Sequence, residues 1–154
     1  MNYTMVDSAV DRSLGLKHGL GMRISPAVED EVRSLVSVLI GKSVSPQAAA
    51  DRRNDQRFPY PHLVHLTPVD DEGLTPVDET IVVVGKHLSL RGLDFYHNEP
   101  LSHRRMIASI ESNNGKKFHF LLDLSWCRFI GHGWYGNGGR FMKVVDAPFS
   151  HFSN

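Results

Sequence analysis

Three arginines stand close together near the middle of the chain, at Arg52, Arg53 and Arg57. A guanidinium group is a permanently charged planar fork that binds phosphate oxygens two at a time. About thirty residues later the chain contains a Ser-x-x-Gly sequence, from Ser89 to Gly92, which offers a hydroxyl group and a backbone that a ligand can approach closely. These two features, in this order, predict a site for a phosphate-bearing ligand.

Both features also have purely structural interpretations. The arginines can form a solvated helix end that pairs with Asp51 or Asp55, and taken alone this is at least as good an explanation as a ligand site. In the Ser-x-x-Gly turn, Gly92 is expected to supply a positive φ angle. The turn can serve backbone geometry and binding together.

Composition limits the classes of function. The 154 residues suit one domain with a short extension, and Lys+Arg and Asp+Glu both number 17. DNA and RNA binding relies on many phosphate contacts, so a chain without excess positive charge is not expected to bind nucleic acids. We expect a cytoplasmic protein without a membrane span, since no long apolar run occurs.

An amphipathic helix is expected ahead of the arginines. Ser25 and Pro26 are typical of a helix start, and Gly41 of a helix end. Apolar residues recur between them at helical spacing: Val28, Val32, Leu35, Val36 and Leu39. Ser45-Pro46 repeats the start signal, which predicts a short second helix that leads into the arginines and ends before Phe58.

From residue 62 onward the pattern changes to the period of two that is typical of β-strands. We expect six strands, separated by short turns such as Asn113-Asn114-Gly115 and Gly131-His132-Gly133. The expected strands are 62–67, 80–86, 93–96, 106–110, 118–126 and 140–145. Six strands at this spacing fit a small closed barrel or a sandwich better than a sheet of βαβ units.

At this point the sequence resembles the PilZ domain family. Arg53-Asn54-Asp55-Gln56-Arg57 resembles that family's RxxxR motif, preceded by Arg52 as in the frequent RRxxxR form, and 87–92 (HLSLRG) resembles its [D/N]xSxxG motif. The late segment from Gly138 to Phe141 is also similar. The resemblance implies a mainly β fold, a six-stranded antiparallel barrel with an N-terminal helical extension. The implied boundaries are 1–49 for leader and helices, 50–146 for the barrel and 147–154 for a tail.

The resemblance further implies a receptor for cyclic di-GMP, a bacterial second messenger, rather than an enzyme. Carried over, Arg53 and Arg57 hold phosphates and lean against guanine faces, while Arg52 contacts a second, stacked ligand molecule. Ser89 and Gly92 line the guanine and phosphate site. Guanidinium planes suit such a ligand, since they pair with phosphates and stack on bases.

His87 departs from the family pattern, which has Asp or Asn at that position. A carboxylate accepts hydrogen bonds from a guanine edge, whereas neutral histidine has one acceptor nitrogen and protonated histidine has none. Binding that is weaker, pH-dependent or absent is therefore one expectation. The alternative function is a degenerate PilZ-like module that binds a protein partner instead of the nucleotide.

Other chemistries have little support in the sequence. The nine histidines show no HExxH spacing and Cys127 is the only cysteine, so no metal site is expected. Cys127 lacks an identifiable base, and the carboxylates show no pairing suited to acid–base catalysis. We interpret Trp126 and Trp134 as core or barrel-rim residues rather than as platforms on which bases stack.

Overall fold

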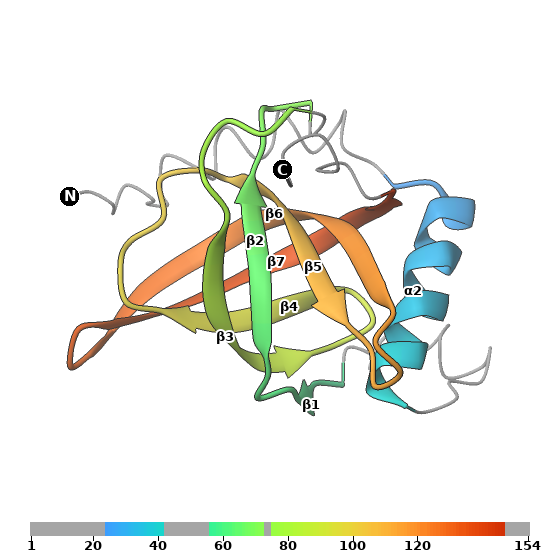
Figure 1. Cartoon of the computed structure of the whole chain (residues 1–154), viewed down its shortest axis with the longest axis horizontal. Coiled ribbons are helices and arrows are strands. Elements are labelled where there is room, and N and C mark those ends of the chain that lie inside the picture. The colour runs from blue at the N-terminus through green and yellow to red at the C-terminus, as the bar shows by residue number, and fades with distance from the viewer. Residues whose placement is uncertain (1–23, 42–55, 73–74, 147–154) are drawn as a thin grey trace.

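A closed six-stranded antiparallel barrel dominates the computed structural model, which describes residues 24–41, 56–72 and 75–146 (Figure 1). The six strands are β2 (Leu63–Pro68), β3 (Ile81–Leu88), β4 (Gly92–His97), β5 (Arg105–Glu111), β6 (Lys117–Gly131) and β7 (Trp134–Val145). Their order is β3-β2-β5-β6-β7-β4, and a β3–β4 pairing closes the circle. The predicted fold class, a mainly β six-stranded antiparallel barrel with an N-terminal helix, is confirmed.

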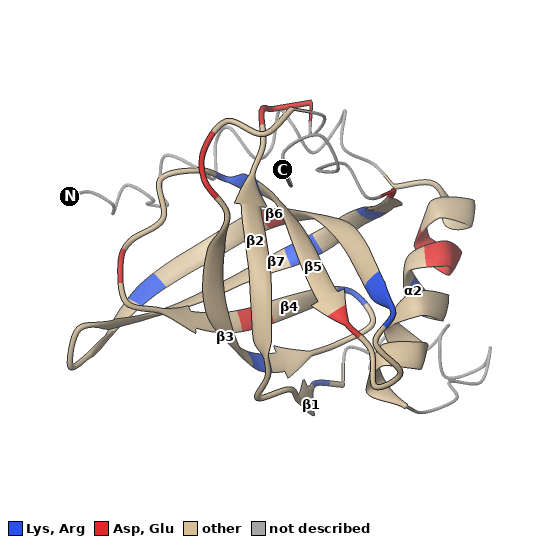
Figure 2. Cartoon of the chain, viewed as in Figure 1, with Lys and Arg blue, Asp and Glu red and all other residues tan. Residues whose placement is uncertain are grey.

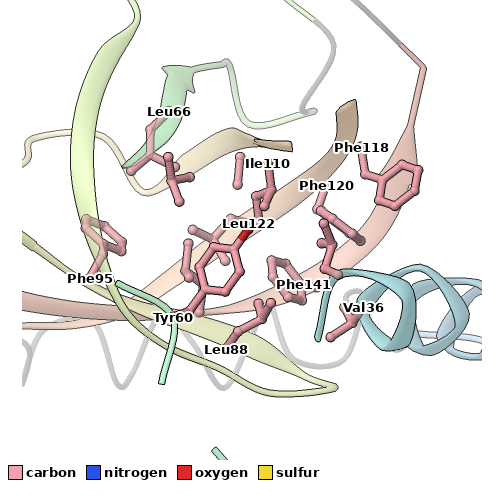
Figure 3. Close-up of a cluster of buried hydrophobic side chains, with 14 of the residues drawn as sticks. Val36, Tyr60, Leu66, Leu88, Phe95, Ile110, Phe118, Phe120, Leu122 and Phe141 are labelled. Atoms are coloured by element: carbon pink, nitrogen blue, oxygen red, sulfur yellow. The ribbon is translucent and has the colours of Figure 1, made fainter. Parts of the chain in front are cut away.

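The barrel interior is filled by the alternate side chains that the strand pattern predicts. On β6, Phe118, Phe120 and Leu122 are buried, and the Phe120 ring lies 4.6 Å from that of Phe141 between centroids. Figure 3 shows these side chains meeting others from β2, β3, β4 and β5 in one cluster. Burial of this apolar surface is the main source of the fold's stability.

Helix α2 (Pro26–Ile40) begins and ends where the sequence predicts. The Ser25 hydroxyl accepts a hydrogen bond from the Val28 N–H at 3.3 Å, and Gly41 ends the helix with a φ of 80°. Three residues of the expected apolar stripe, Val32, Val36 and Leu39, are buried in the same cluster as the barrel interior. The helix therefore shares the hydrophobic core of the barrel and lies at one end of it (Figure 1).

A two-residue strand, β1 (Phe58–Pro59), pairs with β3 on the outside of the barrel. Phe58 lies opposite Leu88 and Pro59 opposite His87. The prolines at 59 and 61 had indicated extended backbone here, but not a paired strand. The short second helix that was expected after Ser45 lies outside the described residues, as do the leader and the tail.

The β6–β7 hairpin is longer than the sequence indicated. Its turn is at the predicted Gly131-His132-Gly133, where all three residues have positive φ angles of 107°, 54° and 79°. β5 pairs with β6 only from Lys117 to Asp123, so the rest of β6 pairs with β7 alone. The end of the hairpin projects beyond the neighbouring strands (Figure 1).

No helix in the described part of the chain combines the length and apolar character that a membrane span requires.

Candidate binding cleft

Four strands align one residue each in a continuous row on the outer face of the barrel. His87 on β3 lies opposite Asp94 on β4, Asp94 opposite Gly138 on β7, and Gly138 opposite Trp126 on β6. Because directly opposed residues on adjacent strands share a face, this row brings an imidazole, a carboxylate and an indole together. The sequence separates its ends by 39 positions, so only strand pairing assembles it.

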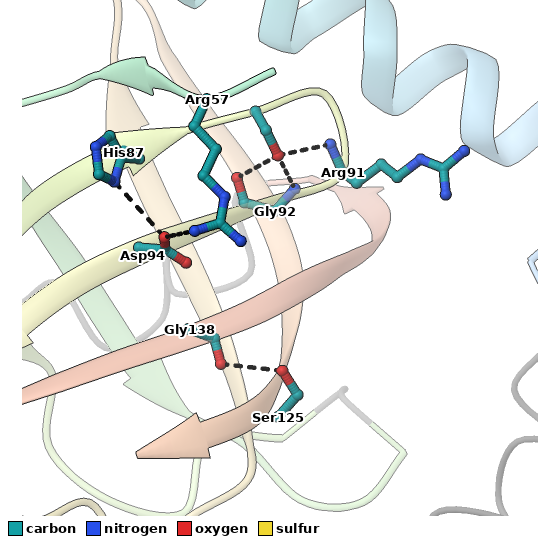
Figure 4. A network of polar contacts seen from close by, with 8 residues as sticks. Arg57, His87, Arg91, Gly92, Asp94, Ser125 and Gly138 are labelled. Atoms are coloured by element: carbon teal, nitrogen blue, oxygen red, sulfur yellow. Dashed lines mark hydrogen bonds and ion pairs between the residues drawn. The ribbon is translucent and has the colours of Figure 1, made fainter. Parts of the chain in front are cut away.

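Arg57 reaches this row because β1 attaches its segment to β3. The Arg57 guanidinium donates a hydrogen bond to the Asp94 carboxylate at 3.1 Å, and Figure 4 shows the two side chains directed toward each other. The Asp94 side chain is 13% exposed and that of Arg57 is 59% exposed. A largely buried carboxylate thus orients an arginine whose remaining N–H groups face solvent.

The Ser89 hydroxyl holds the β3–β4 turn together. It accepts hydrogen bonds from the backbone N–H groups of Arg91 and Gly92 at 3.2 and 3.1 Å (Figure 4). Its own proton is directed to the Gly92 carbonyl oxygen at 3.4 Å. The structural interpretation of Ser89 is therefore correct, and the hydroxyl forms the turn at the edge of the cleft.

The prediction that Gly92 is needed for a positive φ angle is wrong. Its φ angle is not in the left-handed region, which among described glycines is occupied at 41, 115, 131 and 133. Instead, β4 and β7 approach so closely here that a Cβ atom on Gly92 would overlap the Gly139 carbonyl oxygen. Glycine is required by strand contact.

These side chains surround a cleft with a volume of about 390 Å³. That volume falls in the range of roughly 300–1,000 Å³ that is usual for small-molecule sites. The lining residues are Arg57, His87, Ser89, Arg91, Gly92, Leu93, Asp94, Ser125, Trp126, Gly139 and Arg140. Four of the six predicted site residues, namely Arg57, His87, Ser89 and Gly92, thus lie around one cleft, whereas Arg52 and Arg53 lie outside the described residues.

The cleft has a net positive lining, with three arginines against one aspartate. Asp94 is paired with Arg57, while Arg91 and Arg140 form no ion pair within the described part of the chain. The Arg91 side chain extends from the turn toward α2 and away from Arg57 (Figure 4). The charge distribution favours an anion that spans the cleft between Arg57 and the Arg91–Arg140 end.

His87 does not replace the missing acid of the sequence motif, but its neighbour carries one. His87 Nδ1 is buried without a hydrogen-bond partner in the described residues and lies 3.7 Å from an Asp94 carboxylate oxygen. Asp94 is directly opposite His87 in the strand pairing. A carboxylate is therefore present in the cleft, displaced by one strand from the position at which the motif has it.

The Trp126 ring lies across β7, because two glycines of that strand leave room for it. A Cβ atom at Gly138 would overlap the Trp126 indole and come within 2.7 Å of Asp94 Oδ1, and one at Gly136 would lie 3.5 Å from the ring. The Arg128 guanidinium lies 5.4 Å from the Trp126 ring centroid. An indole in such a setting offers a surface on which a planar group can stack.

Asp94, Trp126, Arg91 and Arg140 are cleft residues that the sequence analysis did not assign to the site. Trp126 is half-buried and lines the cleft, and Trp134 is 41% exposed, so both lie at the barrel rim rather than in the core. Only one feature of the sequence points to Trp126 as a cleft residue. Glycine occupies two alternate positions of β7, 136 and 138, which indicates that a bulky side chain crosses this strand.

Two of the histidines have partners of another kind in the structure. His103 contacts Asp78 at 3.2 Å, and the His62 ring packs on Tyr60 with centroids 4.5 Å apart. Over residues 24–41, 56–72 and 75–146, no three His, Cys, Asp or Glu side chains gather as a metal site would require.

Comparison with known proteins leaves the family open. No protein-family model matches the sequence, and no curated protein matches it. One solved structure is similar, that of the Bacillus subtilis inhibitor of motility (MotI/DgrA), with 10% identity and a TM-score of 0.41. The match covers 64% of this chain and 46% of that one, so this chain matches less than half of that protein's length. A similarity of this size assigns neither family nor function.

Proposed function

We propose that this protein is a non-enzymatic receptor for cyclic di-GMP. The observation that carries the proposal is the convergence of Arg57, Ser89 and Gly92, distant in sequence, on one positively lined cleft. The two motifs resemble those of PilZ domains, and Arg57 of the first motif lies at the same cleft as Ser89 and Gly92 of the second, as a shared ligand requires. Trp126 in the cleft lining adds an aromatic surface on which a guanine base can stack.

Each cleft residue then has a role that follows from its chemistry. Arg57, oriented by Asp94, pairs with one phosphate through its exposed N–H groups, and Arg91 or Arg140 pairs with the other. The second carboxylate oxygen of Asp94 accepts hydrogen bonds from the N–H donors of a guanine edge. By resemblance, Arg53 assists Arg57, and Arg52 contacts a second stacked nucleotide.

Ligand binding would act on the connection between α2 and the barrel. Arg57 directly precedes β1, the strand that joins this segment to β3. A phosphate bound to the exposed N–H groups of Arg57 would hold this residue, and with it β1, more firmly against the barrel. This is a means of converting occupancy of the cleft into an altered surface for a protein partner.

A second function, a protein-interaction module on the same barrel, is favoured by one specific observation. Asp94 already neutralises Arg57, and His87 offers no carboxylate. A cleft of this kind can bind an acidic or planar group of a partner protein without binding the nucleotide.

Isothermal titration of the full chain with cyclic di-GMP tests the first function. We expect binding that Arg57→Ala weakens by about tenfold or more, because a charge-assisted hydrogen bond contributes about 1.5–3 kcal/mol. Arg33→Ala is the matched control, since Arg33 pairs with Glu29 and Asp30 on α2 and does not line the cleft.

Two results would reject the receptor function or its site. Absence of heat with the wild-type chain would favour the interaction module, and equal affinity of Arg57→Ala and wild type would place the nucleotide elsewhere. Cyclic di-AMP and GTP, tested in parallel, report whether the cleft selects guanine and the cyclic phosphodiester.

A further inference from the structure

The end of the β6–β7 hairpin exposes large apolar side chains that no part of the described structure covers. Phe129 is 60% exposed, Ile130 50% and Trp134 41%. Together with the Gly131–Gly133 turn they form what we call the hairpin tip, residues 129–134. Single exposed apolar residues are common, whereas three within one turn mark a contact surface.

Both faces of the hairpin end are apolar. The Phe129 ring packs edge-on against Tyr135, with centroids 5.3 Å apart, on one face. On the other face, Ile130 and Trp126 both lie beside Gly136. A Cβ atom on Gly136 would be 3.6 Å from Ile130 and 3.5 Å from the Trp126 ring. A flat protein surface would cover only one of these faces, whereas immersion in a soft apolar medium covers both.

The tip is also a projection rather than a groove. On the side toward the turn, the pairing of β7 with β4 ends at Tyr135, and the pairing of β6 with β5 ends at Asp123. The end of the hairpin therefore stands out from the barrel (Figure 1). A convex apolar end fits a deformable medium, while a protein partner would need a matching cavity.

The charge around the tip favours an anionic partner. From Leu124 to Val145 the chain has no Asp or Glu, but it has Arg128 and His132 at the hairpin end. On the same outer face, Tyr96 lies opposite Gly136, which lies opposite Arg128, and the Lys86 ammonium sits 5.3 Å from the Tyr96 ring centroid. Figure 2 shows no acidic segment along the end of the hairpin itself. The neighbouring acid is the exposed Glu99, two residues after His97, which lies opposite Tyr135.

We propose that the hairpin tip inserts into the surface of an anionic lipid bilayer. Tryptophan and phenylalanine favour the membrane–water interface, where an indole N–H meets polar headgroups and the ring meets acyl chains. Exposed cations beside them are attracted to acidic headgroups. The chain then binds the membrane peripherally through Phe129, Ile130 and Trp134, with Arg128 beside them at headgroup level.

Vesicle flotation without nucleotide tests the proposal, and so keeps it independent of the proposed cyclic di-GMP binding. We expect the full chain to float with phosphatidylcholine vesicles that contain phosphatidylglycerol, and less with phosphatidylcholine alone or at high salt. Phe129→Ser with Ile130→Ser is expected to weaken binding by about tenfold or more, because two apolar anchors are lost.

A matched control removes equally exposed apolar side chains from another surface. Leu63 and Val82, on β2 and β3, are 65% and 47% exposed. Leu63→Ser with Val82→Ser is expected to bind vesicles as the wild type does. Equal loss in both double variants would show non-specific adhesion and overturn the proposal.

Tryptophan fluorescence locates the contact. The chain has two tryptophans, so Trp126→Phe leaves Trp134 as the single reporter, which should shift to shorter wavelength and be quenched by brominated lipids. An unchanged spectrum with anionic vesicles would overturn the proposal. Absence of flotation, together with self-association that the tip variant abolishes, would also overturn it and assign the tip to contact with a second copy.

Discussion

Both halves of the β6–β7 hairpin contain large apolar residues, but the two halves have opposite surroundings. In the inner half, alternate residues of β6 such as Phe120 and Leu122 are buried in the core. In the outer half, Trp126 lines the cleft, and Phe129 and Ile130 are exposed. The difference arises at Asp123, the last β6 residue that pairs with β5. An apolar alternating pattern therefore creates a strand, but a neighbouring strand decides whether that pattern becomes core.

The comparison also separates stability from binding. The inner half contributes buried area, while the outer half presents aromatic and cationic groups at the surface for the cleft and the tip. If this division is correct, substitutions in the inner half should change the free energy of unfolding, and those in the outer half should change ligand or lipid affinity.

The largest effect is expected from removal of a core ring. Phe120→Ala should lower the free energy of unfolding by about 3–5 kcal/mol, because the ring is fully buried against Phe141. Phe129→Ala, the same substitution in the outer half, should change it by only about 0.5 kcal/mol. Urea denaturation of both variants measures the contrast, and equal losses would contradict the division of the hairpin.

An intermediate effect is expected on nucleotide affinity from the outer half. Trp126→Ala should weaken cyclic di-GMP binding by about 1–3 kcal/mol, the contribution of one base stacked on an aromatic ring. Trp126→Ala should lose less thermal stability than Phe120→Ala does. Trp134→Ala is the control, since Trp134 lies at the tip and does not line the cleft. Equal affinities of both tryptophan variants would remove the stacking role.

The smallest effect is expected from a titrating residue in the inner half. Burial, and then the charge of Lys117, lower the pKa of His119 below the usual value of about 6.5. Because the pKa of His119 is lower in the folded chain, the unfolded chain binds the proton first as pH falls below about 6.5. The folded chain is therefore more stable above this pH and loses that stability below it.

His119→Asn should therefore make the loss of stability between about pH 7.5 and pH 5.5 smaller than in the wild type. Urea midpoints at the two pH values report the change. An unchanged difference between the midpoints would show that His119 does not contribute to the acid sensitivity.

Local signals in the sequence were sufficient for most of the fold. The capping residues Ser25 and Gly41 set the helix ends, and the glycine turns set the hairpins, because both depend on a few adjacent residues. The closed barrel rather than a sandwich needed the β2–β5 and β4–β7 pairings, which are contacts between segments far apart in the chain.

The candidate site was predictable only where its residues belong to compact motifs. Arg57, His87, Ser89 and Gly92 were named from sequence, while Asp94 and Trp126 were not, since their place in the cleft depends on strand register. A one-residue shift in register would turn each to the opposite face. The reason that position 92 must be glycine was also not predictable from sequence, because it is the close approach of the β7 backbone.

The amino-acid sequence by itself determined a helix with defined ends, six alternating strands and a pair of arginine and Ser-x-x-Gly elements suited to phosphate. Spacing, capping and turn chemistry act over a few residues, so they can be inferred from the order of residues alone. The tertiary structure decided that Arg57 and the Ser-x-x-Gly turn lie at one cleft, that the Asp94 carboxylate lies beside His87, and that Phe129, Ile130 and Trp134 remain exposed. Those outcomes depend on which strands become neighbours, because burial and charge pairing are properties of contacts between distant segments.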